Sequence, residues 1–471
     1  MGHFYERTEP QSFCGSNTII SRERELRYRW CAEDILTKSS DGKDVFDFFC
    51  FSYEAETEQD KKKRPVIFAF NGGPTVSSSM VHCAFWGPRI LAVDEDGFPC
   101  KEEKGKLRDN PDCLLDIADI CLIDPVNTGF SRLRYPEYAG EFLGDHQDAA
   151  SVSEFVMTWL EKHGRKESPV WLSGESFGST RASLMAWYLK DRADLRGIIH
   201  IGPGYSCSQA TVRTFKDFIP AAALNWYHHR ENKPDFDQWI GEVREFFYKE
   251  YVPAYYIGNE LPEEKKEYIA DKLSYFTSLS AEYYLNHNLR VDRNDIRSMM
   301  LSDLGLKLGS GDGRFTLPSD RKGDPFGEIY GPSVSAGLKN ILKEMGIETS
   351  REYRPSSEKE DDEWDWHYNA SPDMIGYYAN RMPMDAAVSA AMKEHTEMKI
   401  FFATGYYDTV ATVENTRYSI MHTDVDPGRI ILREYRSGHA VYADDVSRKQ
   451  LSDDIRKLLT ENAREENDDV H

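Results

Sequence analysis

The sequence predicts an α/β protein with a mostly parallel central sheet and a large, mainly helical insertion. Two observations predict this class. Short apolar segments, several of them rich in β-branched residues, alternate with helical patterns towards both ends of the chain, which is typical of parallel strands joined by helices. The alternation stops at about residue 204 and resumes at about residue 398, so we expect an insertion between them. With 471 residues, the chain also exceeds what one hydrophobic core usually serves.

Eight segments are expected to form the sheet. Residues 26–36 and 45–53 are compatible with leading strands that need not run parallel to the others. Short, nearly continuous apolar runs are typical of strands that helices cover on both faces. Such runs occur at residues 66–70, 117–123, 170–172, 198–201, 400–403 and 430–432.

Helical periodicity is clearest in residues 145–163. There, apolar residues recur at i, i+3, i+4, i+7 and i+8, which is the spacing of one helix face: Val152, Phe155, Val156, Trp159 and Leu160. A second helix is expected directly after the 170–172 strand, running towards Lys190.

The insertion sets the predicted domain boundaries. We expect residues 1–204 and 395–471 to form the core, and residues 205–394 to form a mainly helical lid rich in aromatic residues. Aromatic residues at helical spacing are more often core than pocket. A glycine-rich loop at 309–313 and an acidic run at 358–363 interrupt the insertion, and the acidic run is expected to be a solvated loop.

The charge of the chain argues against two classes of partner. With 80 acidic and 58 basic residues, the formal net charge is −22, which repels nucleic-acid backbones and anionic membrane surfaces. No apolar stretch approaches the roughly 20 residues needed to cross a bilayer. The N-terminus has no basic start followed by an apolar run, so no secretory signal is expected. We therefore expect a cytoplasmic protein that binds neither nucleic acid nor membranes.

The eight cysteines suggest neither a metal site nor a disulfide framework. All lie in the first half of the chain and none has C-x-x-C spacing. Several occur in apolar runs, where a buried thiol behaves as a small hydrophobic group. A reducing compartment fits this pattern, and no metal or other cofactor is expected.

The candidate nucleophile is Ser176, in the motif Gly-Glu-Ser-Phe-Gly at residues 174–178. A bare Gly-x-Ser-x-Gly is common by chance, but this one lies between a predicted buried strand and a predicted helix. In that context the motif forms a sharp turn that holds the serine in a strained conformation, and the glycines allow the neighbouring chains to approach closely.

A serine nucleophile needs a base, and the base needs an orienting acid. Asp408 follows the predicted strand at 400–403, and His439 follows the predicted strand at 430–432 in the run Ser-Gly-His. This is the chain order Ser, Asp, His that the α/β-hydrolase fold uses. The other aspartates near these strands follow them less closely; they are Asp424, Asp426, Asp444 and Asp445.

Donors for a developing oxyanion are expected from two backbone amides. The run Asn-Gly-Gly-Pro at 71–74 directly follows the strand at 66–70, and a glycine pair there lets a backbone N–H face the substrate. The N–H of Phe177, just after the nucleophile, is the natural second donor. An ordinary turn would explain Gly72 and Gly73 alone. Together with the other elements they predict an α/β-hydrolase.

These motifs resemble the serine carboxypeptidase family. The matching blocks lie on both flanks of the insertion: residues 71–74 with Ser77, Ser78 and Gly87-Pro88, residues 123–131, residues 174–178, Gly405 with Asp408, and Gly438 with His439. Residues 68–74, with Thr180-Arg181 after the nucleophile, look most like the bacterial carboxypeptidase-related branch. The resemblance implies a triad of Ser176, Asp408 and His439, with the amides of Gly73 and Phe177 as the oxyanion hole.

The resemblance also implies a substrate-binding set. In secreted family members, the asparagine and first glycine of the Asn-Gly-Gly-Pro block and two glutamates hold the terminal carboxylate of the substrate. Asn71, Gly72 and Glu175 match this pattern, but Phe85 takes the place of the second glutamate. One carboxyl beside an apolar ring cannot reproduce a pair that shares a proton. The sequence therefore leaves open whether a free C-terminal carboxylate is required.

Three functional hypotheses follow. The first is hydrolysis of a peptide, amide or ester bond in a small-molecule or peptide substrate through an acyl-enzyme on Ser176. The second is an esterase or acyltransferase acting on a small aromatic or apolar acyl group. The third is a non-catalytic binding protein on the same fold, although none of the expected catalytic residues is lost. The oligomeric state stays open, and a homo-oligomer is compatible with the sequence.

Overall fold

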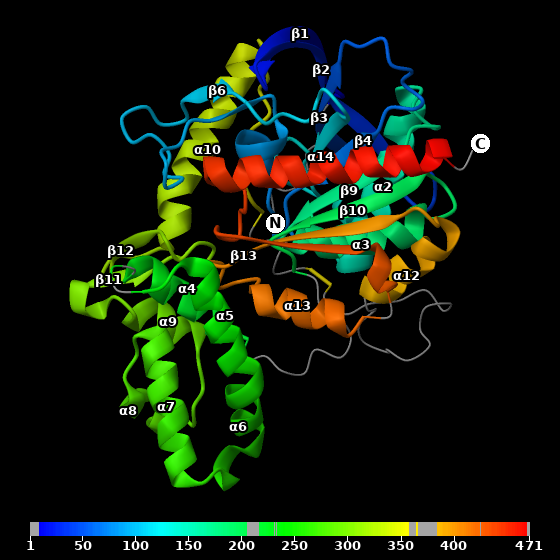
Figure 1. The fold of residues 1–471 in the computed structure, drawn as a ribbon. Coiled ribbons are helices and arrows are strands. Elements are labelled where there is room, and N and C mark those ends of the chain that lie inside the picture. The colour runs from blue at the N-terminus through cyan, green and yellow to red at the C-terminus, as the bar shows by residue number, and fades with distance from the viewer. Residues whose placement is uncertain are drawn as a thin grey trace.

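A mixed sheet forms the centre of the molecule in the computed structural model, which describes residues 9–204, 216–229, 231, 233–357, 364–365, 384–423 and 425–468 (Figure 1). The ten strands lie in the order β1-β2-β3-β7-β4-β9-β10-β13-β14, with β8 paired to β3. Their bounds are β1 Ser12–Ser21, β2 Arg24–Lys38, β3 Asp44–Ala55, β4 Val66–Phe70, β7 Asp119–Ile123, β8 Arg132–Leu133, β9 Val170–Glu175, β10 Leu195–Ile201, β13 Lys399–Gly405 and β14 Ile430–Tyr435.

The direction of the strands agrees with the sequence analysis. The six strands from β7 to β14 along this order run parallel, whereas β1, β2 and β3 pair antiparallel. Every predicted strand is present. The sequence did not predict the two-residue strand β8 or the strand β1, whose residues alternate between exposed and partly buried positions over most of its length. Its identity as a strand depends on its pairing with β2, which is a tertiary contact.

Helices cover both faces of the sheet and bury alternate side chains of each strand. On one face, Val66, Phe68 and Phe70 pack in a hydrophobic cluster with α2 (Asp145–Lys162), α3 (Phe177–Leu189) and α12 (Met384–Glu394). On the other face, Ile67 and Ala69 pack with α10 (Pro325–Glu344), α14 (Asp445–Asp468) and the turn η1 (His82–Trp86) that follows α1 (Ser79–Val81). Because helices cover both faces of the sheet, the sequence of β4 is continuously apolar.

A group of shorter helices projects from one side of this core (Figure 1). They are α4 Phe218–His228, α5 Phe236–Phe246, η4 Phe247–Tyr251, α6 Val252–Ile257, η5 Gly258–Glu260, α7 Glu263–Thr277, α8 Ala281–Asn286, α9 Arg293–Met299 and η6 Ser302–Leu304. They enclose their own hydrophobic cluster, which includes Tyr406, Tyr407 and Val413 from beyond the insertion. Trp239, one of the aromatic residues of these helices, is buried in this cluster as core.

The remaining elements are small. Two antiparallel pairs lie outside the main sheet, β5 (Arg89–Leu91) with β6 (Leu107–Asp109) and β11 (Leu306–Leu308) with β12 (Thr316–Pro318). The others are η2 Pro136–Glu141, α13 Val413–Met421 and η8 Pro427–Arg429. The predicted boundaries of the insertion stay a prediction; within 205–394, α10 and α12 pack against the central sheet. The acidic run at 358–363 lies outside the described residues.

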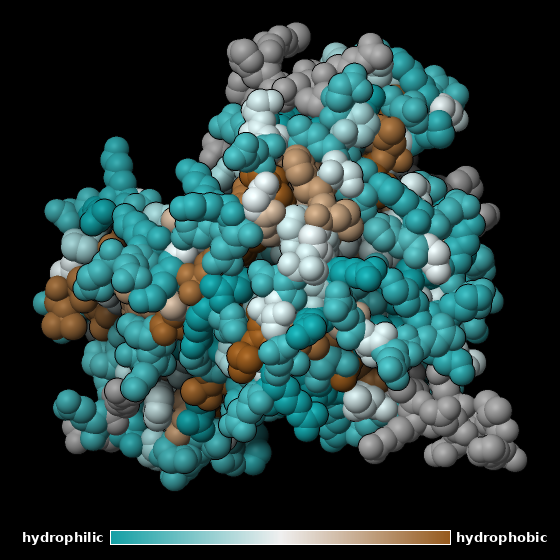
Figure 2. Space-filling view, turned by 90° about the horizontal axis from the view of Figure 1, so that it is seen from above, coloured by the Kyte–Doolittle hydropathy of each residue, from teal (hydrophilic) through white to brown (hydrophobic). Residues whose placement is uncertain are grey.

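Figure 2 shows a face that is largely hydrophilic, with apolar residues in small patches between polar ones. Within the described ranges, the helices are too short or too polar to cross a bilayer. The same part of the chain holds no group of three or more histidine, cysteine or acidic side chains arranged for a metal ion.

The expectation of a chain without disulfides is wrong at one position. Cys14 and Cys31 form a disulfide between β1 and β2, where they are direct partners in the antiparallel register. Sequence spacing could not reveal this pair because the pairing depends on the register of a strand that the sequence did not predict. Five cysteines are free thiols: Cys50, Cys83, Cys100, Cys113 and Cys121. Cys207 lies outside the described residues, and cytoplasmic localisation stays a prediction.

The disulfide can be checked by peptide mapping. Digestion without reductant should release one cross-linked pair of peptides that contains Cys14 and Cys31, and prior reduction should separate them. The free cysteine Cys100 serves as the control, because its peptide should have the same mass under both conditions. Recovery of Cys14 only as a free thiol from protein purified without reductant would contradict the assignment.

Candidate active site

Ser176 lies at a sharp turn between β9 and α3. Its backbone has φ 56° and ψ −124°, a conformation that a residue with a side chain adopts only under strong constraint. A β-carbon at position 174 would lie only 2.0 Å from the carbonyl oxygen of Gly178, so only glycine fits there. The Ser176 N–H donates to Ile201 O at 3.0 Å, which joins the turn to the end of β10. The motif therefore forms the strand–turn–helix that the sequence predicted.

Asp408 and His439 meet in the loops that follow β13 and β14. His439 Nδ1 hydrogen-bonds to Asp408 Oδ2 at 2.7 Å. The other oxygen of Asp408 accepts from the N–H groups of Val410 at 2.7 Å and Ala411 at 3.0 Å, and the side chain is fully buried. Both oxygens of Asp408 accept hydrogen bonds, which hold this side chain in one orientation. Because Asp408 binds Nδ1 of the imidazole, Nε2 of His439 points away from Asp408.

The segment after β10 contacts both the serine turn and the histidine loop. Gly204 N donates to Ser176 O at 3.1 Å. A β-carbon at Gly202 would lie 2.9 Å from His439 Nδ1, so the imidazole rests directly against the Gly202 backbone. This short segment brings Ser176 and His439 to the same edge of the sheet, at the carboxyl ends of parallel strands.

The other aspartates near these strands have different partners. Asp444 accepts from Arg314 and Ser437, and Asp445 is bonded to Arg448. Asp426 accepts from the backbone of Gly428. Asp424 lies outside the described residues. Among the described aspartates of this group, Asp408 is the one bonded to His439.

The glycine-rich loop at 309–313 contacts the histidine loop, a contact that the sequence did not predict. The His439 N–H donates to Gly311 O at 2.6 Å, within the glycine-rich loop at 309–313. Arg314 is buried and donates to Asp312, and also to Ser437 Oγ at 3.1 Å. The composition of this loop marked it as a turn but carried no signal of its partner.

The loop Asn71–Pro74 lies against the serine turn. It directly follows β4, the neighbour of β9 in the sheet. A β-carbon at Gly72 would lie 2.5 Å from Phe177 N and 2.6 Å from Glu175 O, so this backbone packs on the turn without room for a side chain. Gly73 has φ 112°, which favours glycine. The structure thus brings together the two segments that carry the Gly73 and Phe177 amides.

Glu175 is buried and both of its carboxyl oxygens accept hydrogen bonds. Asn71 Nδ2 donates to Oε1 at 2.9 Å, and the hydroxyl of Tyr442 donates to Oε2. The Asn71 amide is fixed in turn, because its Oδ1 accepts from Val81 N at 3.1 Å. The sequence predicted Asn71 and Glu175 as site residues, but it missed Tyr442.

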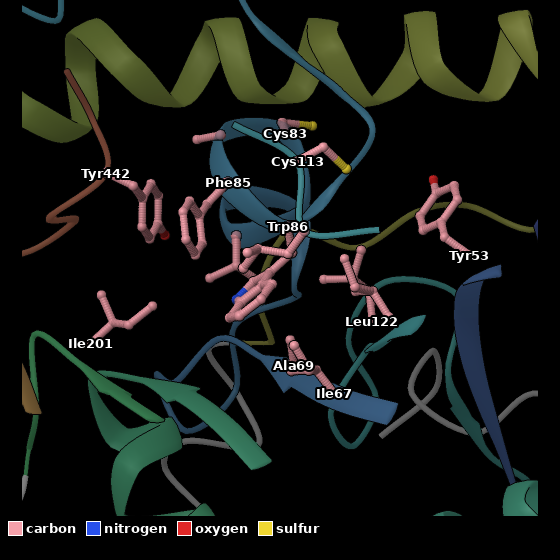
Figure 3. Close-up of a cluster of buried hydrophobic side chains, with 14 of the residues drawn as sticks. Tyr53, Ile67, Ala69, Cys83, Phe85, Trp86, Cys113, Leu122, Ile201 and Tyr442 are labelled. Atoms are coloured by element: carbon pink, nitrogen blue, oxygen red, sulfur yellow. The ribbon is translucent and has the colours of Figure 1, made fainter. Parts of the chain in front are cut away.

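Phe85 packs against Tyr442. The two rings are stacked, with centroids 5.4 Å apart and planes 11° from parallel (Figure 3). Phe85 also meets Trp86 edge to face, and all three rings are buried. Phe85 thus supports the tyrosine that hydrogen-bonds to Glu175. Tyr442 stands three residues after His439, and nothing in the local sequence pattern marks it.

Burial and charge shift two pKa values at this site. Burial raises the pKa of Glu175 to about 7; His439 and the Asn71 hydrogen bond oppose this rise. Burial alone would lower the pKa of His439, but the charge and hydrogen bond of Asp408, with a smaller effect of Glu175, raise it to about 9. Glu175 and His439 therefore influence each other's protonation.

Comparisons with known proteins agree with this architecture. A family model described as "Serine carboxypeptidase" matches residues 37–196. "Serine carboxypeptidase-like 37" of Arabidopsis thaliana is 28% identical over 163 residues, which cover 32% of this chain and 31% of that protein. The chain thus matches about a third of the length of this relative. Both matches are to a part of the chain, and the family model ends before Asp408 and His439.

Similarity to a solved structure extends over nearly the whole chain. Kex1(delta)p, a prohormone-processing carboxypeptidase from Saccharomyces cerevisiae, superposes with a TM-score of 0.55 and 13% identity, covering 93% of this chain and 91% of that one. The predicted α/β-hydrolase fold is confirmed. The bacterial branch stays a prediction, as do the roles of the site residues.

The link between Glu175 and His439 predicts a shift in pH dependence. In Glu175→Gln the negative charge is lost, so the pKa of His439 should fall, and NMR titration of this imidazole should give a lower midpoint. If His439 must be neutral for activity, the acidic limb of kcat/KM should move to lower pH by the same amount. Glu161→Gln, on the exposed surface of α2, is the control and should shift neither. An unchanged His439 midpoint in Glu175→Gln would exclude the coupling.

Proposed function

We propose that this protein is a serine hydrolase that cleaves a peptide, amide or ester bond through an acyl-enzyme on Ser176. The observation that carries the proposal is the 2.7 Å hydrogen bond between Asp408 and His439 beside the strained turn at Ser176. The α/β-hydrolase fold and the partial match to the serine carboxypeptidase model support it. The substrate is a small molecule or a peptide.

In the first half of the reaction, neutral His439 accepts the proton of Ser176 Oγ through Nε2 while the oxygen attacks the carbonyl carbon. The carbonyl oxygen becomes negative and is stabilised by the N–H groups of Gly73 and Phe177. Asp408 stabilises the imidazolium that forms. His439 then donates its proton to the leaving nitrogen or oxygen, the bond to the leaving group breaks, and the acyl group stays on Ser176.

In the second half, water replaces the leaving group. His439 accepts a proton from water, the hydroxide oxygen attacks the ester carbon, and the same two amides stabilise the second oxyanion. The proton returns to Ser176 Oγ as the acid is released. With an alcohol in place of water, the same acyl-enzyme would yield an ester, so analysis of products formed with added alcohol separates hydrolysis from acyl transfer.

Glu175 favours a substrate without a free carboxylate. The two donors that contact it, Asn71 Nδ2 and the Tyr442 hydroxyl, are directed to its own oxygens. A substrate carboxylate would need donors of this kind, and the charged form of Glu175, which predominates above its pKa of about 7, would repel it. An amide or hydroxyl group can instead donate to the remaining lone pairs of Glu175. We therefore propose that peptide amides and esters are preferred to peptides with a free C-terminus.

The nucleophile can be tested with a fluorophosphonate probe. Wild-type protein should be labelled, and Ser176→Ala should not, because the probe forms a covalent bond with an activated serine oxygen. Ser183→Ala is the matched control: Ser183 is a buried serine on α3 whose hydroxyl is bonded to Ser179 O, and its loss should leave labelling intact. Absence of labelling in the folded wild type would contradict the proposal and favour a non-catalytic binding protein.

The proposed preference can be tested with Tyr442→Phe. Loss of the hydroxyl removes a donor to Glu175, so the neutral carboxyl is favoured and can donate to a carboxylate. The kcat/KM ratio for blocked dipeptides with free versus amidated C-termini should rise about tenfold, the effect of one charge-assisted hydrogen bond. Tyr435→Phe loses a comparable bond to Asp454 and is the control. A strong preference of wild type for the free carboxylate would disprove this specificity.

A further inference from the structure

Arg181 is a fully buried arginine on α3, one turn after Phe177. Its Nε donates to Asp148 Oδ2 at 2.5 Å, and neither side chain is exposed. Its guanidinium also packs over the rings of Phe70 and Phe177, with the central carbon 5.2 Å and 5.7 Å from the ring centres. In the family resemblance, Arg181 served only to indicate a branch of the family. Arg181 has no role in the mechanism proposed above.

The remaining nitrogens of Arg181 bind the glycine loop. Nη1 donates to Asn71 O at 2.7 Å and Nη2 donates to Pro74 O at 3.1 Å. These two carbonyls bracket Gly72 and Gly73. A planar guanidinium with fixed donor directions can hold two carbonyls and one carboxylate together, whereas a lysine ammonium cannot reproduce this geometry.

The position of Arg181 connects the two proposed oxyanion donors. The helix that carries Arg181 begins at Phe177, which supplies one amide, and the loop that Arg181 holds contains Gly73, which supplies the other. The loop has no side chains at Gly72 and Gly73, so side-chain packing cannot fix the backbone there. The guanidinium instead joins loop and helix, and Asp148 on α2 fixes the guanidinium.

Burial of the ion pair does not by itself identify the role of Arg181. Removing two charges from water costs several kcal/mol per ion, so a buried ion pair is often no more stabilising than apolar residues of similar size. Arg165 is an equally buried arginine that pairs with Asp119 at the start of β7, at the opposite edge of the sheet from Ser176; Asp119 also pairs with Arg64. Arg165 also donates to a backbone carbonyl, Arg64 O, at 2.8 Å. Arg165 is therefore a comparable buried arginine without contact to the site.

We propose that Arg181, oriented by Asp148, is a positioning residue that holds the Gly73 amide in register with the Phe177 amide for oxyanion stabilisation. The proposal rests on the proposed serine hydrolase function. Its effect should appear in the transition state and not in substrate binding, because the oxyanion forms only as the bond is made.

The first test is Arg181→Lys, measured with a p-nitrophenyl ester and with active sites counted by fluorophosphonate. We expect kcat to fall about 10- to 100-fold with KM within about twofold, because a displaced donor loses most of its effect on the oxyanion. Arg165→Lys should lose comparable thermal stability but keep wild-type kcat. Equal kcat in Arg181→Lys and wild type would overturn the inference.

The second test separates positioning from general stability. A trifluoromethyl ketone accepts Ser176 Oγ at its carbonyl carbon and becomes an oxyanion, whereas the corresponding alcohol does not. Arg181→Lys should weaken the ketone by about the same factor as kcat and leave the alcohol unchanged. Equal weakening of both, or of neither, would contradict a positioning role.

Two controls keep the inference separable from its premise. If wild-type protein is not labelled by fluorophosphonate, the proposed serine hydrolase function is wrong, and this result is independent of the role of Arg181. If Arg181→Lys does not fold, Asp148→Asn decides, because it keeps the size of the partner but removes its charge. It should lower kcat and ketone affinity together, by a smaller factor; unchanged values of both would overturn the inference.

Discussion

The close backbone contact within residues 174–178 is the constraint on which the rest of the site depends. A β-carbon at Gly174 would collide with Gly178, and one at Gly72 would collide with the amide of Phe177, so three chain segments meet here without intervening side chains. This contact forces Ser176 into a conformation with positive φ and projects it above the carboxyl end of β9. Strain of this kind persists only where surrounding structure enforces it. Here the hydrogen bond to Ile201 O and the packing of α3 on the sheet do so.

The parallel strands place the other functional groups around that turn. Because β4, β9, β10, β13 and β14 are parallel neighbours in this order, the loops after them open at one edge of the sheet. Asn71, Ser176, Asp408 and His439 each follow one of these strands, and the segment after β10 packs between Ser176 and His439. The glycine-rich loop of the insertion closes the arrangement through the His439 N–H. The glycine-rich loop is therefore part of the site's geometry.

Burial strengthens the hydrogen bonds between the polar groups of the site. In a poorly solvated region, a hydrogen bond is stronger and an unpaired polar atom is more costly. Asp408 has both oxygens engaged, and so does Glu175 through Asn71 and Tyr442. The stacked ring of Phe85 supports Tyr442, so an apolar residue at this position preserves a polar contact. The buried Arg181–Asp148 pair lies against the loop that carries Asn71. This ion pair links the loop to α2.

Much of this could be predicted from the sequence because its causes are local. Strand periodicity marked β4 as Val66–Phe70, and the order of Ser176, Asp408 and His439 after successive strands indicated the fold and the candidate site. The sequence by itself thus determined most strands of the central sheet, the turn at Ser176 and the residues that carry the proposed chemistry. Only the tertiary structure decided that Cys14 pairs with Cys31, that Tyr442 hydrogen-bonds to Glu175 and that Arg181 holds Asn71 and Pro74. Tyr442 and Glu175 are 267 residues apart in the chain, and their contact depends on strand register and loop packing, which no local pattern records.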